Sequence, residues 1–549
     1  MAVYRNDQVD FSFGAEIGLG GYLAPVKATA DASGDLTTTT DTITLPGART
    51  IGVTATTNAV IGEYVQIGTT GTNGTEIRKI VKITAGASLT LNAPVGFYHE
   101  SGESVQTVDT TDSLGTMAGL ARDTNTSHMM RFTPGVWESI EVPDPAMEIE
   151  GRYFLGTESK RNFYAAYKGQ QSLSGTLSNF ELLNGYPLRF PLGTVSTVGA
   201  DKGGTAGAGT VNGIIYAGQY EFDVATYANY AVADYIQVDV GVLSEVRKIT
   251  AISSGNFWVD YPFLFQHANG VACNEVVAPY THTLLEAVEL ASVSWQVKNR
   301  DSSETAANDW IRRYFGGKIG QATLTAEEGG TLRMSWESAP FIDMNHNQYD
   351  DTARTTVNKW DGSNLAATVE YPTTNPYYFS QGSITMFGVE FARITNFTIN
   401  INNNLEPRYF IRDDGSERTP SNIYEGRREY SMTATIVLPD SVSATDTTRT
   451  IFKELLSEGD YGSGMAGFDI DLVFNRGAIT ATVDDTITIN IPGDTQESLD
   501  VSGTGGNNQG AFIRSANTSV STDNPASAEV DILFRNMKIV VIDSEPVYP

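Results

Sequence analysis

Glu150-Gly-Arg152-Tyr153-Phe154 and Glu406-Pro-Arg408-Tyr409-Phe410 are two versions of one stretch, 256 residues apart. Three further matches follow in the same order along the chain: Tyr167-Lys-Gly169 with Tyr424-Glu-Gly426, Ser172–Leu177 with Ser431–Ile436, and Leu182, Leu183 and Gly185 with Leu455, Leu456 and Gly459. The offsets only rise, from 256 to 274, as expected for two copies of one unit with insertions in the second. The sequence therefore predicts a duplicated large unit.

A shorter module is duplicated as well. Glu63-Tyr-Val-Gln-Ile67 recurs as Asp234-Tyr-Ile-Gln-Val238, and Glu76-Ile-Arg-Lys-Ile80 recurs as Glu245-Val-Arg-Lys-Ile249. Further along, Pro94 and His99 recur with the same spacing as Pro262 and His267. A module of this size, built from short strands, is typical of a small β-barrel or sandwich.

The two repeats are nested, and this predicts the domain organisation. We expect an N-terminal arm over 1–24 and the first small module over 25–110. The first large unit is expected over 111–193 and 284–345, with the second small module, 194–283, inserted in it behind a glycine-rich linker, Gly203 to Gly213. A polar connector over 346–376 then leads to the second large unit, 377–549.

The fold class is predicted to be mainly β. Alternating runs such as Thr398-Ile399-Asn400-Ile401 and Asp469-Ile470-Asp471-Leu472-Val473 are separated by Gly, Asn and Asp clusters. The best helix candidate is Thr447 to Ser457, with Ala306 to Phe315 as a second, so each large unit is expected to carry about one helix.

The charge limits the function. The chain has 549 residues, 65 acidic and 36 basic, and a net charge of −29. Such a surface disfavours tight binding of nucleic acid, which requires Lys and Arg to displace counterions. It does allow a surface along which nucleic acid passes without adhering. The excess of Arg (24) over Lys (12), with so many acids, would suit a host that lives in high salt.

Cysteine usage and hydropathy bear on the compartment. Cys273 is the only cysteine, which excludes an intramolecular disulfide and a Cys-based zinc site. The start, Met1 to Asp7, lacks the apolar segment of a signal peptide, and no stretch approaches the about 20 apolar residues that span a bilayer. We therefore expect a protein that folds in a cytoplasm.

Candidate metal ligands are sparse. The five histidines are His99, His128, His267, His282 and His346. His99 and His267 hold equivalent places in the small repeat, but neither has a second His or Cys at ligand spacing, so we interpret them as structural. Asp343-x-Asn345-x-Asn347 begins like a calcium loop, yet Gln348 replaces the required Gly and Arg354 the bidentate Glu. We reject an EF-hand there and interpret the segment as a connector, with a looser Ca²⁺ or Mg²⁺ site as the alternative.

Catalytic motifs are not supported either. Gly462-Ser-Gly464-Met-Ala-Gly467 fits G-x-G-x-x-G, but the strand that should precede it follows it instead. Carboxylate pairs such as Glu327-Glu328 are expected on an acidic surface. The aromatic pairs near Tyr377 and Tyr409 lie in alternating strands and are interpreted as packing residues. The sequence predicts no catalytic, cofactor-binding or metal site and no enzyme activity.

At this point the chain resembles the tail tube (major tail) proteins of long-tailed double-stranded DNA viruses. The resemblance rests on stretches of the large units: Arg312–Ile319, Tyr378-Phe-Ser-Gln-Gly382, Val389-Glu-Phe-Ala-Arg393, Asn402-Asn-Asn-Leu-Glu406 and Glu425-Gly-Arg-Arg-Glu-Tyr430. It covers about two thirds of the chain and not the small modules. It implies two β-sandwich or barrel domains with one flanking helix each, six such domains per ring, and rings stacked head to tail.

A chain with two tube domains then implies a trimeric, pseudo-hexameric ring and a channel for DNA ejection. The resemblance also implies a virion tail assembled in the host cytoplasm, with copies of itself, a tape measure protein, a tail terminator and distal tail or baseplate proteins as partners. We expect inter-ring contacts from Met1 to Pro25 and Asn402 to Asn422, and acids rather than Lys or Arg facing the lumen. The alternative is another baseplate, adhesin or surface-layer β protein that binds host glycans through the small modules.

Overall fold

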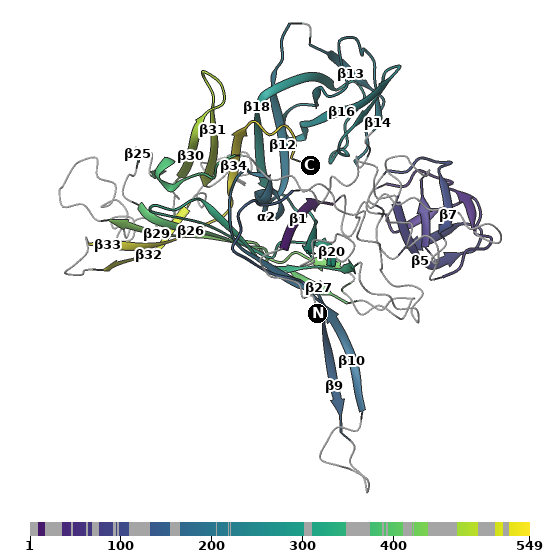
Figure 1. The fold of residues 1–549 in the computed structure, drawn as a ribbon, viewed down its shortest axis with the longest axis horizontal. Coiled ribbons are helices and arrows are strands. Elements are labelled where there is room, and N and C mark those ends of the chain that lie inside the picture. Colours follow the sequence, from purple (N-terminus) through teal and green to yellow (C-terminus); the bar gives the residue numbers. More distant parts are fainter. Residues whose placement is uncertain are drawn as a thin grey trace, which may run out of the picture.

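The fold consists almost wholly of strands (Figure 1). The computed structural model describes residues 9–16, 36–45, 48–61, 64–68, 76–91, 95, 98–108, 132–153, 165–204, 206–217, 219, 221–300, 310–346, 374–386, 389–390, 394–409, 420, 422–437, 469–491, 511–519 and 526–548. Within these ranges there is a single α-helix of one turn, α2 (Arg189–Leu192), which continues the 3-10 turn η2 (Tyr186–Leu188). The prediction of a mainly β fold is confirmed.

One eight-stranded antiparallel sheet runs through both large units. Its strands, in spatial order, are β32 (Ala511–Ser519), β33 (Ser527–Phe534), β29 (Glu429–Val437), β26 (Ile394–Asn402), β21 (Gln321–Glu327), β22 (Arg333–Pro340), β11 (Ser174–Glu181) and β8 (Ser139–Glu141). The first four belong to the second unit and the last four to the first unit. Pairing of β21 with β26, from Gln321 opposite Asn402 to Glu327 opposite Asn396, joins the units.

The two halves of this sheet have the same topology. In chain order the first unit supplies β8, β11, β21 and β22, and the second supplies β26, β29, β32 and β33. In both, the spatial order is third, fourth, second, first. The duplicated sequence therefore encodes two units whose strands are connected in the same order.

Four covering strands belong to each unit and again have the same order in both; those of the first unit form a sheet of their own, and those of the second form one end of a 12-stranded sheet. In the first unit they are β1 (Val9–Ala15), β19 (Val293–Asn299), β20 (Trp310–Gly317) and β23 (Asp343–His346). In the second they are β24 (Gly382–Met386), β30 (Ile470–Ala478), β31 (Asp484–Ile491) and β34 (Lys538–Asp543), with β25 (Val389–Glu390) beside β24 and η6 (Phe379–Gln381) before it.

A single apolar core fills the space between the eight-stranded sheet and the covering sheets. In the first unit it centres on Trp295 and Trp336, both fully buried, with ring centroids 6.1 Å apart. Phe13 of β1 meets Trp336 edge to face at 5.1 Å. Sandwiches of this kind gain most of their stability from such alternate inward residues.

Two sequence expectations differ from the structure here. Residues 9–15, expected within an arm over 1–24, form β1 and pair with β19, because Phe11, Phe13 and Ala15 are buried in the core. The helix expected over Ala306 to Phe315 is wrong from Trp310 onward, where β20 pairs with both β19 and β23. The helix predicted over Thr447 to Ser457 and most of the connector 346–376 lie outside the described residues.

The two small modules are six-stranded barrels with one topology. The first barrel contains β2 (Thr37–Thr39), β7 (Ser104–Val108), β4 (Tyr64–Ile67), β5 (Glu76–Thr84), β6 (Ser88–Leu91) and β3 (Thr50–Gly52), closed by the bridge between Thr40 and Val53. The second contains β13 (Ala208–Asn212), β18 (Ala272–Glu286), β15 (Tyr235–Val238), β16 (Glu245–Ser253), β17 (Asn256–Val259) and β14 (Glu221–Val224). Strand β13 occupies part of the stretch expected to be a linker, Gly203 to Gly213, because Val211 packs in the barrel core.

Both barrels lie, in chain order, between strands of the first unit's two sheets. The first lies between β1 and β8 and the second between β11 and β19, whereas the second unit has no barrel within its described residues. The second barrel stands on a stem in which β12 (Gly193–Asp201) pairs with the lower half of β18. The expected domain boundary between 283 and 284 therefore falls inside β18.

The stem is fixed to the second unit. Strand β18 pairs with β34, from Tyr280 opposite Asp543 to Leu284 opposite Ile539. Within this ladder the buried His282 lies 3.1 Å from Asp543 through Nε2 and stacks on Tyr548 with ring centroids 3.6 Å apart. The second barrel is consequently held by both units.

Candidate functional site

The exposed face of the eight-stranded sheet is a broad, regular surface that both large units share. Along each strand alternate residues point to opposite faces. On β26, Phe397, Ile399 and Ile401 enter the core, while Asn396, Thr398, Asn400 and Asn402 face outward. Neighbouring strands continue this pattern in register, so hydroxyl and amide groups cover the face. The hydroxyl residues on it are Thr323, Thr325, Ser335, Ser431, Thr433 and Thr435.

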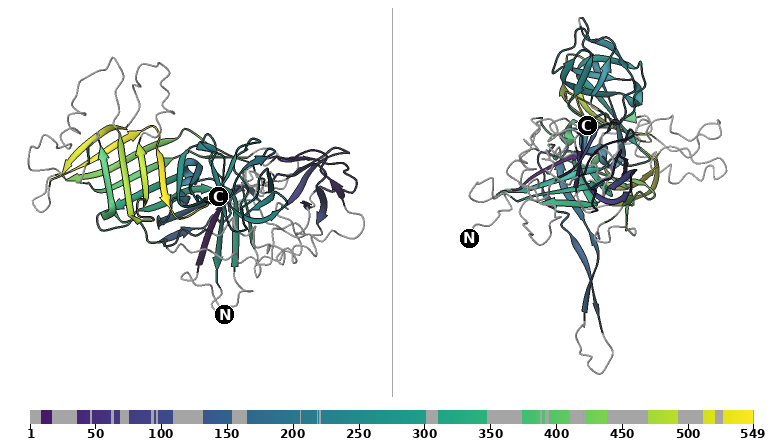
Figure 2. Two further views of the ribbon diagram at one scale, coloured as in Figure 1. Left: turned by 90° about the horizontal axis from the view of Figure 1, so that it is seen from above. Right: turned by 90° about the vertical axis from the view of Figure 1, so that its right-hand side faces the viewer.

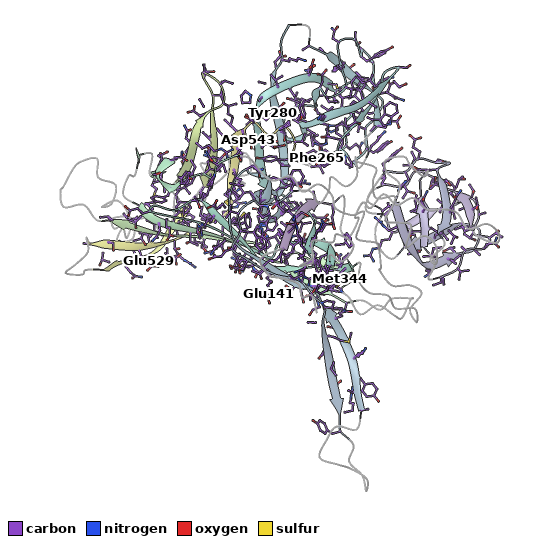
Figure 3. All side chains as sticks on the ribbon, viewed as in Figure 1. Glu141, Phe265, Tyr280, Met344, Glu529 and Asp543 are labelled. Atoms are coloured by element: carbon purple, nitrogen blue, oxygen red, sulfur yellow. The ribbon has the colours of Figure 1, made fainter. Side chains whose placement is uncertain are left out.

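The charged groups on this face are mostly acidic. The eight strands contain no lysine, and their only arginines are Arg333 and Arg514. Arg514 is neutralised by Asp531, at 2.8 Å. The carboxylates on this face are Glu141, Glu181, Glu327, Glu337, Glu429, Glu529 and Asp531. They extend across the whole sheet, with Glu141 near the middle of the molecule and Glu529 at the far end of the second unit (Figure 3). A surface of this composition repels phosphates and offers few cations to hold them.

Among the described residues, both ends of the sheet have an open edge. At one end β32 pairs there only with β33. At the other, the short β8 covers β11 only from Thr176 to Ser178. Unpaired edges template further strand pairing unless they are covered, so the sheet is suited to continue into another chain.

Each unit also carries a hairpin at an equivalent place. The long hairpin joins β9 (Ala146–Arg152) to β10 (Ala165–Ser172), and the short one joins β27 (Glu406–Arg408) to β28 (Asn422–Tyr424). In the long hairpin Glu150 faces Tyr167 and lies 2.9 Å from Arg152. The same arrangement recurs in the short one, where Glu406 faces Tyr424 and lies 2.7 Å from Arg408.

Residues 159–532 of the chain match the family of phage tail tube proteins. The chain belongs to this family. A comparison with curated proteins gives no match. Family membership makes the protein a virion component that assembles with copies of itself into a tail tube. Among the described residues, no helix has the length and apolar character needed to cross a membrane.

In this tail tube protein a largely buried network of ion pairs connects the two large units. Lys318 Nζ lies 2.6 Å from Glu425, and Arg428 lies 3.1 Å from Glu286. Burial raises the pKa of Glu425, but the Lys318 ammonium and the backbone N–H of Leu290 outweigh burial and hold the pKa below its usual value. Both ion pairs cross from the first unit to the second.

The repeated histidines of the barrels are buried beside carboxylates. His99 is buried and its Nδ1 lies 2.9 Å from Glu103. His267 is buried between Asp239, at 3.2 Å, and Glu245, at 2.9 Å. Within the described residues, no three His, Cys, Asp or Glu side chains gather as metal ligands.

Glu245 and Arg247 explain why the small repeat keeps its spacing. Arg247 is fully buried, pairs with Glu245 and donates to the Pro262 carbonyl at 3.0 Å. Burial raises the pKa of Glu245, yet Arg247, His267 and the N–H of Leu264 together hold it below its usual value. The repeated Glu, Arg, Pro and His therefore form one network that holds a loop against the barrel.

Other candidates from the sequence are accounted for in part. Tyr377 is buried, donates to Asp485 at 2.5 Å and lies under Arg476, so it packs at an interior position. Tyr409 donates to the Gln171 carbonyl at 3.2 Å and thereby links the two hairpins. His128, the segment Gly462 to Gly467 and residues 347–354 lie outside the described residues, and nothing is described of the side chains of Asp343, Asn345 and His346.

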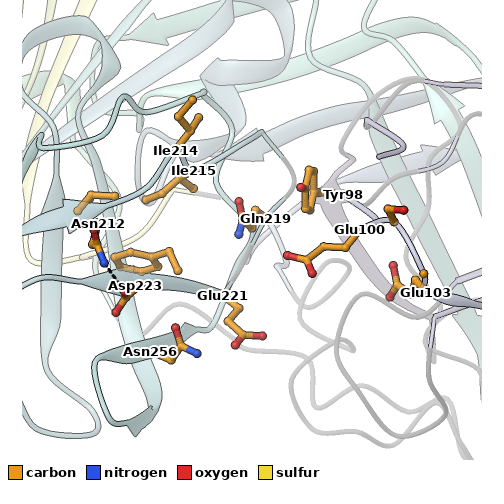
Figure 4. A pocket seen from close by; sticks show the side chains of 14 residues that line it. Tyr98, Glu100, Glu103, Asn212, Ile214, Ile215, Gln219, Glu221, Asp223 and Asn256 are labelled. Carbon is orange, nitrogen blue, oxygen red and sulfur yellow. Dashed lines mark hydrogen bonds between the residues drawn. The ribbon is translucent and has the colours of Figure 1, made fainter. Parts of the chain in front are cut away.

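A cavity of about 680 Å³ lies between the barrels and was not predicted. Tyr98 and Glu100 of the first barrel face Gln219 and Glu221 of the second across it (Figure 4). Burial, and after it the Glu100 carboxylate, raises the pKa of Glu221, although a hydrogen bond to Trp258 opposes the rise. The long hairpin was also missed, although the match of Glu150 with Glu406 and of Tyr167 with Tyr424 marked both of its strands.

Proposed function

We propose that three copies of this tail tube protein close into a ring and that stacked rings form the channel for viral DNA. The observation that carries the proposal is the pairing of β21 with β26 inside one chain. By strand order, β32 of the second unit is equivalent to β21, and β8 of the first unit is equivalent to β26. The pairing within the chain is therefore a template for pairing β8 of one subunit with β32 of the next.

Ring closure removes the two open edges. Eight strands per chain, taken three times, give a barrel of 24 strands (3 × 8) with pseudo-sixfold symmetry. Closed barrels leave no edge for uncontrolled pairing. Head-to-tail contacts between such rings generate an open filament, as a tube requires.

The exposed face of the sheet supports a role as the lumen wall. Its hydroxyl and amide groups solvate a passing duplex, and its carboxylates repel the phosphates. Over three subunits the net charge is −87 (3 × −29). This composition agrees with the expected excess of acids over cations on the lumen, and it favours DNA that slides without pausing.

The proposed tube also suggests where the other tail proteins would bind. The tape measure protein would fill the lumen before DNA, and the terminator and distal tail proteins would cover the two exposed ring faces. Membership in a structural virion family favours a role without catalysis and assembly of the tail inside the host cell. We further propose that residues 9–16 belong to the first unit, with the two barrels as its insertions.

Electron microscopy of the assembled protein tests the proposal. We expect hollow tubes whose cross-section has threefold symmetry and six similar wall segments. Purified protein that stays monomeric at high concentration and high salt, or rings with any number of subunits other than three, would contradict it.

A further inference from the structure

The cavity between the two barrels is lined mainly by groups that form hydrogen bonds. Its volume of about 680 Å³ lies within the range of about 300–1,000 Å³ that is usual for sites of small molecules. Nine of its fourteen lining residues carry a carboxylate, an amide or a hydroxyl group. A site for an apolar ligand is lined predominantly by apolar side chains, so this cavity favours a polar ligand.

The second barrel supplies a row of polar side chains to the cavity. Strands β13, β14 and β17 are neighbours, and Asn212, Asp223 and Asn256 lie directly opposite one another across them. Asn212 Nδ2 donates to Asp223 Oδ2 at 2.5 Å. Two residues before Asp223, and on the same face of β14, the Glu221 carboxylate accepts a hydrogen bond from the indole of Trp258. The row therefore places hydrogen-bond donors and acceptors side by side.

The first barrel lacks this row. Its ladder between β3 and β6 has the same register as the ladder between β14 and β17, and the places equivalent to the polar ones are occupied by Thr50, Gly52 and Ser88. Both barrels have the same strand order and a filled apolar core. The barrel fold therefore does not require carboxylates and amides at these places, which indicates a task specific to the second barrel.

Two amides at the cavity retain groups that can bond to a ligand. Gln219 Oε1 accepts from the Tyr216 N–H at 3.0 Å, and its Nε2 has no partner among the described residues. The side-chain amide of Asn256 likewise has no partner in the described part of the chain. Both amides lie at the cavity in Figure 4. A cation cannot accept from these N–H groups, whereas a hydroxyl group accepts from an amide and donates to a carboxylate.

The charge of the cavity limits the class of ligand further. Its lining contains the carboxylates of Glu100, Glu103, Glu221 and Asp223 and no Lys, Arg or His. Such a lining repels phosphorylated, sulfated and other acidic ligands. Within the described residues no three His, Cys, Asp or Glu side chains gather as metal ligands, so the carboxylates are spread around the cavity and do not converge on one ion.

Apolar surface is present beside the polar groups. Tyr98 lines the cavity, whereas Tyr216, which covers one face of its ring, does not. The cavity therefore meets a part of the Tyr98 ring that Tyr216 leaves uncovered. Ile214 of the second barrel also lines it and is 46% exposed. A sugar ring carries hydroxyl groups around its edge and C–H groups on its faces, and so matches both kinds of surface.

We propose that the inter-barrel cavity binds a neutral saccharide, whose hydroxyl groups bond to Gln219, Glu221, Asp223 and Asn256 and whose C–H face packs on Tyr98. The second barrel stands on the side of the covering strands, across the core from the exposed face of the eight-stranded sheet (Figures 1 and 2). In the proposed tube the cavity then lies outside the lumen, within reach of saccharides on a host surface. Binding itself does not depend on assembly of the tube.

Binding of the labelled full chain to an array of neutral and acidic oligosaccharides tests the site. We expect binding to neutral saccharides only. Asp223→Ala and Asn256→Ala should each weaken it about tenfold, because each removes a hydrogen-bonding partner of the ligand. Ser88→Ala, at the place equivalent to Asn256 in the first barrel, is the matched control and should leave binding unchanged. Urea unfolding of each variant checks that the barrels remain folded.

Glu221→Gln distinguishes a saccharide from a cation. The variant removes the charge but keeps an oxygen that accepts from Trp258 and from a hydroxyl group, so saccharide binding should persist. Calorimetry with spermidine and with CaCl₂ gives the comparison. A parent chain that binds no saccharide of the array, binds acidic ones best, or takes up only spermidine or Ca²⁺ would overturn the proposal, as would equal losses in Asn256→Ala and Ser88→Ala. Because these measurements use the unassembled chain, their outcome leaves the ring proposal standing.

Discussion

Tyr98 of the first barrel stacks on Tyr216 of the second, with ring centroids 4.9 Å apart and planes only 4° apart. The two residues flank equivalent bridges: His99 pairs with Thr44 in the first barrel, and His267 pairs with Ile215 in the second. The places equivalent to Tyr98 and Tyr216 are occupied by Gln266 and Leu45. Among the described residues the barrels therefore meet through one aromatic pair, and the symmetric second stack cannot form.

Tyr98→Ala should release the first barrel from the second without unfolding either. Stacked aromatic pairs contribute about 0.5–1.5 kcal/mol beyond their buried area. A double-mutant cycle with Tyr216→Ala, followed by urea unfolding, should return a coupling energy in that range. Tyr98→Phe keeps the ring and serves as the control. Additive effects of the two alanine substitutions would show that the stack contributes nothing.

Phe13→Ala should destabilise the first unit by about 3–5 kcal/mol, as is usual when a buried Phe is truncated. Phe13 packs against Trp336, Tyr186 and Phe190. Chemical unfolding monitored by tryptophan fluorescence measures the loss. Tyr153→Ala, at a strongly exposed position, is the matched control and should leave stability unchanged. If Phe13→Ala left the free energy of unfolding as unchanged as Tyr153→Ala does, β1 would not be needed for the stability of the first unit.

Glu425→Gln should make the joint between the units less sensitive to acid. The pKa of Glu425 is lower in the folded protein than its unfolded value of about 4.3. A depressed pKa contributes stability above pH about 4.3 that disappears as the pH falls through the folded pKa. The parent protein should therefore lose more stability than the variant between pH 7 and pH 3 in urea titrations. Parallel curves for the two proteins would contradict the assignment.

Thr433→Lys should convert the sheet face into one that holds DNA. Thr433 lies on the outward face of β29, opposite Thr398 and Asp531. Three added cations per ring, repeated along the tube, should produce salt-dependent co-sedimentation with duplex DNA, which the parent tube lacks. Val288→Lys, at a fully exposed position outside the eight strands, should not. Equal binding by both variants would place Thr433 outside the lumen.

The sequence predicted the repeats well because each rests on residues with a specific task. In the second barrel Glu245, Arg247, Pro262 and His267 form one buried network, which gives these repeated residue types a shared task there. Glu150 and Glu406 recur because each faces a Tyr in its hairpin.

Other features could not be read from local patterns. Strand β1 carries Phe11 and Phe13, but its partner β19 is almost 300 residues away in the chain, so the short segment looked like an arm. Trp310 to Phe315 has apolar residues at helical spacing, yet pairing with β19 and β23 decides its conformation. The inter-barrel cavity belongs to no motif, because its lining comes from separate segments of the two barrels.

The placement of both barrels on the first unit has an evolutionary consequence. A wall built from six identical copies repeats every insertion six times, and each insertion must then fit its own image at every neighbouring position. Fusion of two units into one gene lets the two units diverge. The first unit then carries insertions between β1 and β8 and between β11 and β19, while the second unit keeps short connections such as that from β25 to β26. In the proposed threefold ring, the barrels therefore occupy alternate positions around the tube. The spaces between barrels then result from gene duplication and not from packing.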